Sequence, residues 1–98
     1  MKLPKKVRVN RTEYYVSAHR APAKRDLGMV QYGNKAILIY DTGPDGRQRS
    51  QATIDETFWH ELTHAILWET GEHKLARSEE FVVKFSKALH EAISTARF

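Results

Sequence analysis

Two histidines and a glutamate are the residues of this chain best suited to chemistry. The segment WHELTHAILWE, residues 59–69, places Glu61 directly after His60, and His64 follows four residues after His60. Residues i and i+4 lie on one side of a helix, so both imidazoles can reach one metal ion. Glu61 is rotated by about 100° from His60, which makes it a poor ligand but brings it close to a water on the metal. The pattern H-E-x-x-H therefore predicts a zinc site with its own general base.

This arrangement predicts hydrolysis. Two neutral imidazoles hold Zn²⁺, and the ion lowers the pKa of a bound water to about 7. Glu61 can take the proton of that water and pass it to a leaving amine. We expect a zinc metallopeptidase that acts on a peptide or protein substrate. Two alternatives are a zinc-containing binding module that uses the basic N-terminal region and a structural zinc site with four protein ligands.

A catalytic zinc needs a third protein ligand, and a chain without cysteine must supply it from His, Glu or Asp. Glu79 and Glu80 at the start of the next predicted helix are the best candidates. On a helical wheel, Glu79 lies about 100° from the centre of the apolar stripe and Glu80 about 160° away, which favours Glu79. Glu80 stays open as the alternative. Glu72 and His73 are weaker candidates, because they lie past the predicted end of the first helix.

Alternating apolar and polar residues predict strands over residues 6–9 and 13–18, joined by a turn as a hairpin. A second hairpin is predicted across residues 29–41 around Gly33-Asn34. The unbroken apolar run 36–39 predicts a central strand that is buried on both faces. Residues 20–28 contain Pro22 and Gly28 and predict a loop.

Two helices are predicted after a Gly- and Pro-rich loop. Thr53 and Glu56 have capping-box spacing, so the first helix should begin there or up to a turn earlier and end at Gly71. Ser78 is a good N-cap for the second helix. The expected fold is α+β, with a small antiparallel sheet of three or four strands, in two hairpins, packed on two C-terminal helices. The expected core stripes are Ile54, Phe58, Leu62 and Ala65 on the first helix and Phe81, Val82, Phe85, Leu89 and Ala92 on the second.

Composition limits the remaining questions. The 98 residues suit one domain over 1–98, and 41% hydrophobic with 29% charged residues is typical of a globular protein. No apolar run approaches the ~20 residues that cross a bilayer, so we expect a cytoplasmic protein without membrane contact. The net charge is +4, and basic residues crowd the first quarter, where solvated strand faces or a nucleic-acid surface would explain them. These residues are Lys2, Lys5, Lys6, Arg8, Arg11, Arg20, Lys24 and Arg25.

The chain resembles zincins that use a glutamate as third ligand, specifically the short single-domain HExxH proteins of bacteriophages and prophages, which are relatives of the ImmA/IrrE-type metallopeptidases. The resemblance rests on ETFWHELTHAILWETG, with weaker support from LPKKVRVNRTEYYV, KAILIYD and EEFVVKFSKAL. It implies a minimal gluzincin-type lobe, zinc, peptide-bond hydrolysis and the cytoplasm of a bacterial host cell. His60 and His64 would be ligands, Glu61 the base, and one glutamate of the pair 79–80 the third ligand. The Asn or Asp that larger relatives carry soon after that glutamate is replaced here by valines 82 and 83.

Substrate contacts are less well defined by the sequence. An exposed sheet edge, such as the strand MVQYG over residues 29–33, could pair with an extended peptide. Residues whose type suits stabilisation of an oxyanion are Tyr32, Tyr40, His73 and Arg77.

Overall fold

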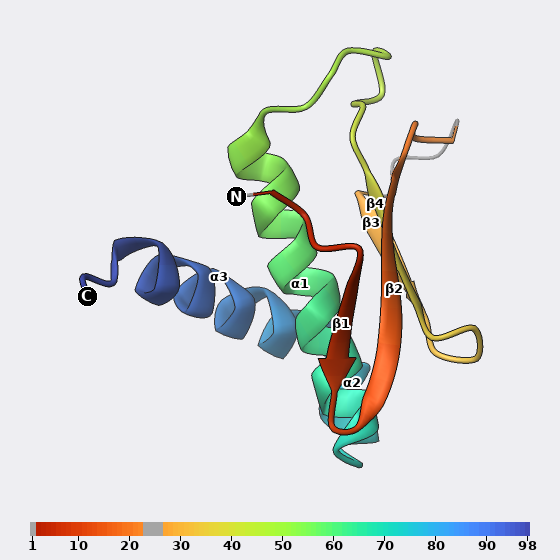
Figure 1. Ribbon diagram of the computed structural model, residues 1–98, viewed down its shortest axis with the longest axis vertical. Coiled ribbons are helices and arrows are strands. Elements are labelled where there is room, and N and C mark those ends of the chain that lie inside the picture. Colours follow the sequence, from red (N-terminus) through yellow and green to blue (C-terminus); the bar gives the residue numbers. More distant parts are fainter. Residues whose placement is uncertain (1, 23–26) are drawn as a thin grey trace.

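The computed structural model describes residues 2–22 and 27–98. Within this part of the chain one four-stranded sheet is covered by helices on one face (Figure 1). Its elements are β1 (Lys6–Val9), β2 (Thr12–His19), β3 (Gly28–Gln31), β4 (Ala36–Tyr40), α1 (Gln51–Glu69), α2 (His73–Ala76) and α3 (Glu79–Thr95). The predicted α+β class, the two hairpins and the two long helices are confirmed. Residues 23–26 of the predicted loop, with Lys24 and Arg25, lie outside the described residues.

The sheet is mixed. β1 pairs with β2 and β3 pairs with β4 in antiparallel fashion, as expected for two hairpins. The strand order is β1-β2-β4-β3, and β2 and β4 are parallel, with Val16 opposite Ile37. The prediction of a wholly antiparallel sheet is therefore wrong at this central pair. Parallel strands need a crossover, and here the chain crosses to the far edge, forms β3, and returns as β4 in the direction of β2.

The core lies between the sheet and α1. The predicted stripe on α1 is confirmed, because Ile54, Phe58, Leu62 and Ala65 are all buried. They form one cluster with residues of the facing sheet side, which are Val9, Tyr14, Val16, Ile37 and Ile39. Leu38 points to the opposite side and is only half-buried. The prediction that β4 is buried on both faces is thus wrong, since the helices pack on one face alone in the described part of the chain (Figure 1).

Both long helices begin at recognisable signals, and α1 also ends at one. The Ser50 side chain caps α1 by accepting from the backbone N–H of Thr53, so the helix starts about one turn before the predicted capping box. Gly71 follows the C-cap with φ +86°, which glycine adopts without strain. Ser78 caps α3 by accepting from the backbone N–H of Phe81. The short helix α2 fills the connection and was not predicted.

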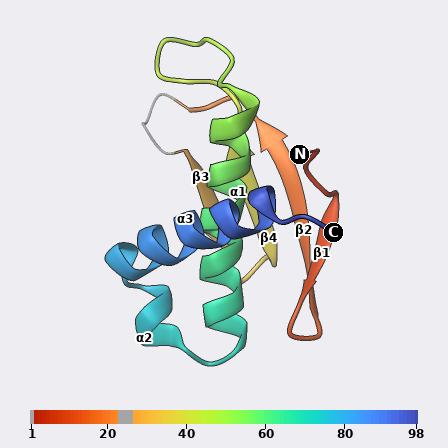
Figure 2. The same cartoon turned by 90° about the vertical axis from the view of Figure 1, so that its left-hand side faces the viewer.

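α3 crosses α1 (Figure 2), and its C-terminal half extends beyond the rest of the fold (Figure 1). Only Val82 and Ser86 of α3 are buried. The predicted core stripe is therefore partly wrong, because Phe85 is 49% exposed and stacks on Phe81 instead of packing in the core. A steep crossing buries only a few residues of each helix, whatever the length of the apolar stripe.

The C-terminal end of α1 is fixed to the sheet by Glu69. Its carboxylate accepts hydrogen bonds from the Tyr14 hydroxyl at 2.6 Å, the Lys35 ammonium at 2.8 Å and the Thr12 hydroxyl at 3.1 Å. Asn10 donates its side-chain amide to the Glu69 backbone oxygen at 2.8 Å. These contacts come from both hairpins, so they set the position of the helix that carries the HExxH residues.

Candidate metal centre

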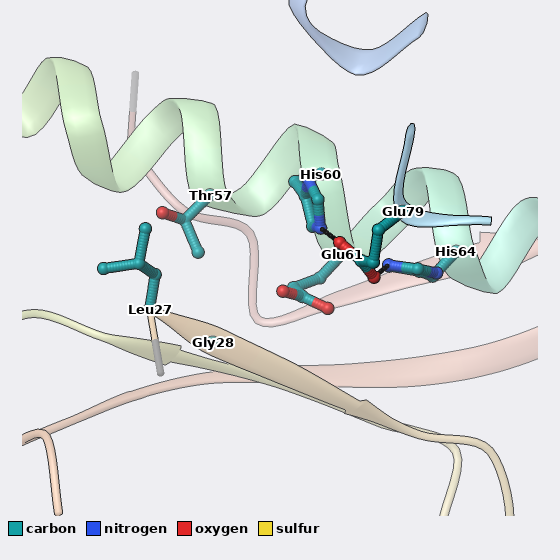
Figure 3. A pocket seen from close by; sticks show the side chains of 7 residues that line it. All are labelled: Leu27, Gly28, Thr57, His60, Glu61, His64 and Glu79. Atoms are coloured by element: carbon teal, nitrogen blue, oxygen red, sulfur yellow. Dashed lines mark ion pairs between the residues drawn. The ribbon is translucent and has the colours of Figure 1, made fainter. Parts of the chain in front are cut away.

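His60, His64 and Glu79 converge at the crossing of α1 and α3. One carboxylate oxygen of Glu79 lies 3.2 Å from His60 Nε2, and the other lies 2.8 Å from His64 Nε2 (Figure 3). One ligand atom from each residue lies within 4.8 Å of the others. The two imidazoles come from successive turns of α1, whereas Glu79 is the first residue of α3. The site therefore depends on the packing of the two helices.

The orientation of His64 is set by the connection between the helices. Its Nδ1 lies 2.7 Å from the Ala76 carbonyl oxygen, and a carbonyl can only accept, so Nδ1 carries the proton. In the neutral ring this leaves the lone pair on Nε2, the atom that faces Glu79. Histidines that bind a metal through one ring nitrogen commonly donate a hydrogen bond from the other.

His60 is also suited to binding a metal. Burial lowers the pKa of its imidazole, and His64 lowers it further, while the charge of Glu79 opposes both effects. A lowered pKa favours the neutral ring, which is the form that coordinates metals. The His60 side chain is 22% exposed and that of Glu79 is 68% exposed, so solvent reaches one side of the cluster.

The donor set fits a divalent transition-metal ion. Two imidazole nitrogens and one carboxylate oxygen are the three-ligand set of many catalytic zinc sites. The Nε2 lone pair of His64 and the Glu79 carboxylate, which lie 2.8 Å apart, repel unless a proton or a cation lies between them. A metal ion held by the three residues would remove this repulsion and leave further coordination positions toward solvent.

The structure separates the two glutamates that the sequence left as alternatives. Glu79 turns to both imidazoles, whereas Glu80 pairs with Lys84 one turn along α3, at 3.3 Å, on the exposed side. His73 is also outside the cluster, because its ring stacks on Trp68 and its Nε2 lies 3.1 Å from the Trp68 carbonyl oxygen. Which glutamate binds a metal stays a prediction, and the geometry favours Glu79.

Glu61 lies in the same cavity as the cluster. The cavity measures about 400 Å³ and is lined by Leu27, Gly28, Thr57, His60, Glu61, His64 and Glu79. In Figure 3 the Glu61 side chain projects from α1 toward the space between the sheet edge and the histidines. It is 7% exposed. Its carboxylate thus lies in the cavity beside the proposed ligands, which is where a general base would act.

Gly28 allows β3 to approach α1 closely beside Glu61. A Cβ atom at this position would lie 2.8 Å from the Leu38 carbonyl oxygen, 2.9 Å from Thr57 Cγ2 and 3.3 Å from Glu61 Cγ. The loop predicted over residues 20–28 included Gly28, but this residue is the first of β3. An isolated glycine at a strand end gives no warning of such an approach until the neighbouring helix is known.

Of the four residues whose type suits stabilisation of an oxyanion, Tyr32 has a pKa that the charges of the site affect. Burial raises the pKa of its hydroxyl, and the charges of Glu61 and Glu79 raise it further. Its ring stacks on Trp68 at a centroid distance of 4.3 Å. Tyr40 is buried, with its hydroxyl 3.9 Å from Met29 Sδ.

Arg77, the last of these four residues, follows α2 as its C-cap. Of the four, Tyr32 is the residue whose hydroxyl pKa is raised by the charges of Glu61 and Glu79, and we take it as the candidate for this reason.

Arg49 is a residue of this region that sequence reasoning missed. Its guanidinium donates to the carbonyl oxygens of Leu27 and Thr53, each at 3.1 Å, to that of Tyr40, and to the Thr57 hydroxyl at 2.6 Å. Burial lowers the pKa of Arg49, and the charge of Asp41 opposes this. An arginine in a Gly- and Pro-rich loop carries no sequence signal for such a role.

Comparison with known protein families, with curated proteins and with solved structures finds no match for this chain. None of the helices within residues 2–22 and 27–98 combines the length and hydropathy needed to cross a bilayer.

Proposed function

We propose that this protein is a zinc-dependent metallopeptidase, related to the small HExxH proteins that its sequence resembles. The observation that carries the proposal is the meeting of both imidazole Nε2 atoms with the Glu79 carboxylate in a cavity that also holds Glu61. A structural zinc site would need a fourth protein ligand, and the metal-ligand group found among the described residues has three members. Three ligands with an exposed side are typical of catalytic zinc.

The chemistry divides between the metal and this chain. A bound zinc ion would make water acidic and polarise a peptide carbonyl. Glu61 accepts a proton from the attacking water as the new bond forms between the water oxygen and the carbonyl carbon. When the C–N bond breaks, Glu61 returns this proton to the leaving nitrogen, which yields one carboxyl and one amino product. Tyr32 is the candidate donor to the carbonyl oxygen as negative charge develops on it.

An extended peptide is the substrate form that fits the fold. β3 is an edge strand of the sheet and borders the cavity through Gly28. An extended chain could add to this edge by backbone hydrogen bonds, which would pass its peptide groups in front of the metal. In the basic N-terminal region, the alternative nucleic-acid surface, Lys6 is paired with Glu13 at 3.0 Å.

The metal is tested with a matched pair of variants. Glu79→Gln should bind zinc at least tenfold more weakly than the wild type, because a charged ligand is lost. Glu80→Gln, one residue away and 81% exposed, should bind zinc normally. Zinc stoichiometry and affinity after dialysis against a competing chelator measure both. Equal affinities for the two variants would refute the assignment of Glu79.

The reaction is tested with Glu61→Gln. We expect this variant to keep stoichiometric zinc and to lose at least a hundredfold in hydrolysis of a peptide library, because general base catalysis is removed. Mass spectrometry of the digest, with wild-type protein in the presence and absence of chelator, identifies the cleaved bonds. A zinc-loaded wild type that cleaves nothing would refute the peptidase.

A further inference from the structure

We propose that the sheet face turned away from the helices binds single-stranded nucleic acid. This function is separate from the metal centre and does not depend on the proposed peptidase. The helices of the described part of the chain all lie on the other face of the sheet (Figure 1). A four-stranded sheet with one open face is a framework on which RNA-binding modules stack unpaired bases. This outer face carries, among others, Lys6, Arg8, Glu13, Tyr15, Ser17 and Gln31.

An exposed tyrosine lies near the middle of the outer face. Tyr15 alternates with the core residues Tyr14 and Val16 along β2, so its ring points away from α1, and it is 60% exposed. β2 is an inner strand, and Ala36 is the partner of Tyr15 on the neighbouring strand β4. The methyl group of this alanine is too short to cover the ring. A base of any identity can stack on such a ring, because every base has a flat π surface.

Charge is divided unevenly along the chain. Residues 1–50, which form the strands and their loops, contain eleven lysines and arginines and four acidic residues, a net charge of +7. Residues 51–98, which form the helices, contain five and eight, a net charge of −3. The sheet layer is thus basic, although the whole chain carries only +4. Contacts of lysine and arginine with phosphates supply most of the sequence-independent affinity for nucleic acid.

Two of these cations lie beside Tyr15 on β1. Lys6 is the cross-strand partner of Tyr15, and Arg8 lies two residues later on the same face. Arg11, in the turn between β1 and β2, and Arg20, which follows β2, are also exposed. Basic residues therefore lie beside the ring and at both ends of β2. A strand of nucleic acid that stacks one base on the ring would bring its neighbouring phosphates to them.

Glu13 is the only acidic residue in the four strands of the described sheet, and it lies on the outer face. It is 3.0 Å from the Lys6 ammonium, but the Lys6 and Glu13 side chains are 64% and 42% exposed. An ion pair with this exposure is weak, so Lys6 can exchange it for a phosphate. The Glu13 carboxylate opposes the binding of phosphates, and its removal should therefore strengthen the binding of nucleic acid.

Other polar side chains of the outer face are engaged with their neighbours. The Ser17 hydroxyl lies 2.7 Å from His19 Nε2, and the Gln31 side-chain oxygen accepts from the Asn34 amide at 3.1 Å. Groups that are already paired offer little for reading base edges or 2′-hydroxyl groups. We therefore expect binding with little preference for sequence, and similar affinities for DNA and RNA.

Fluorescence anisotropy with a labelled oligothymidylate of about ten nucleotides tests the aromatic contact. Tyr15→Ala should weaken binding at least about fivefold because one stacked base is lost, whereas Tyr15→Phe should bind as the wild type does. Phe85→Ala is the matched control, because Phe85 is also aromatic and 49% exposed but lies on α3. The same strand annealed to its complement should bind more weakly, because its paired bases cannot reach the ring. Oligouridylate should bind like the DNA strand.

Matched variants test the charged residues. Glu13→Gln should strengthen binding about twofold or more, whereas Glu80→Gln, which breaks a similar exposed pair with Lys84 on α3, should leave it unchanged. Lys6→Gln and Arg8→Gln should each reduce the slope of log affinity against log salt concentration by about 0.7, the loss of one phosphate contact. Lys84→Gln should leave this slope unchanged.

Four results would each overturn the proposal. They are no binding of oligothymidylate at low salt, a duplex bound as tightly as the single strand, equal losses for Tyr15→Ala and Phe85→Ala, and equal effects of Glu13→Gln and Glu80→Gln. Glu61→Gln should bind the oligonucleotide as the wild type does. The surface and the peptidase can therefore be refuted separately.

Discussion

Outside the core, we expect the largest effect on stability from a substitution that removes the hydrogen bonds of Glu69. We expect Glu69→Gln to destabilise the protein, because its carboxylate joins the end of α1 to Tyr14 of the first hairpin and to Lys35 between β3 and β4. Glutamine has nearly the same shape, but its amide nitrogen cannot accept a hydrogen bond. Tyr14 and Lys35 both donate to Oε2, so the amide oxygen can replace that atom, and Thr12 at Oε1 would lose its acceptor. The negative charge would be lost for all three donors.

The size of the effect follows from the burial of each partner. Tyr14 is 0% exposed, so its hydroxyl cannot turn to water, and its hydrogen bond would fall from the about 1.5–3 kcal/mol of a charged acceptor to the about 0.5–1.5 kcal/mol of a neutral one. The bond that Thr12 loses adds about 0.5–1.5 kcal/mol. The Lys35 side chain is 38% exposed, which limits its ion pair to about 0–1 kcal/mol. Glu69→Gln should therefore lower the free energy of unfolding by about 2–3 kcal/mol. For a domain of this size that corresponds to a fall in Tm of roughly 10–20 °C.

The effect should depend on pH in a defined direction. The hydrogen bonds from Lys35 and Tyr14 lower the pKa of Glu69 in the folded protein. A carboxyl whose pKa is depressed by folding stabilises the protein above its unfolded pKa of about 4.3, and this stabilisation is lost as the pH falls through the folded pKa. The gap between wild type and Glu69→Gln should therefore be complete at pH 6 and narrow below pH 4.

Urea denaturation at several pH values measures this gap. Glu13→Gln is the control, because Glu13 is also paired with a lysine, Lys6, but both side chains are largely exposed. We expect Glu13→Gln to leave the unfolding midpoint essentially unchanged. Combining Tyr14→Phe with Glu69→Gln should show a coupling of about 1–2 kcal/mol, as expected for residues in direct contact. A gap below about 0.5 kcal/mol, or one that does not change with pH, would refute this account of Glu69.

Two further predictions concern the cavity. Gly28→Ala should lower the free energy of unfolding, measured by urea denaturation, by about 1–3 kcal/mol, because the new Cβ would lie 2.8 Å from the Leu38 carbonyl oxygen. Gly33→Ala, where no atom lies within 4 Å of the new Cβ, should lower it far less. Similar losses for the two variants would contradict the close approach at Gly28. Tyr32→Phe should lower kcat about tenfold or more without changing zinc affinity, whereas Tyr40→Phe, buried near Met29, should leave kcat unchanged. Equal kcat values for the two tyrosine variants would exclude the hydroxyl of Tyr32 from the reaction.

Local signals in the sequence located most elements but not the central pairing of the sheet. Alternation of apolar residues and the caps Ser78 and Gly71 depend on neighbours within one turn or strand, so they can be recognised without the fold. The parallel pairing of Val16 with Ile37 joins segments that are far apart, and either direction would satisfy the same apolar pattern. Nothing in the residues themselves distinguishes the two.

At the candidate site, too, some features follow from local sequence signals and others depend on how the elements pack. Spacing on one helix brought His60 and His64 together in the prediction, because i and i+4 are neighbours on any α-helix. The preference for Glu79 over Glu80 came from a helical wheel, and the contacts of the two side chains in the structure favour the same residue. The helical wheel also placed Phe85 in the core, and this prediction is wrong, because an apolar stripe does not reveal how much of its length another helix covers. The roles of Arg49 and Gly28 depend on contacts between elements, which no local pattern contains.

The acceptor for His64 Nδ1 is a main-chain oxygen, that of residue 76. A substitution at residue 76 would leave this backbone oxygen in place, so it would not abolish the hydrogen bond that orients the His64 ring. Insertions or deletions between Gly71 and Ser78 would move it. We therefore expect the length of this connection to be under tighter constraint than its residue types, and a one-residue deletion there to disturb the imidazole more than any single exchange.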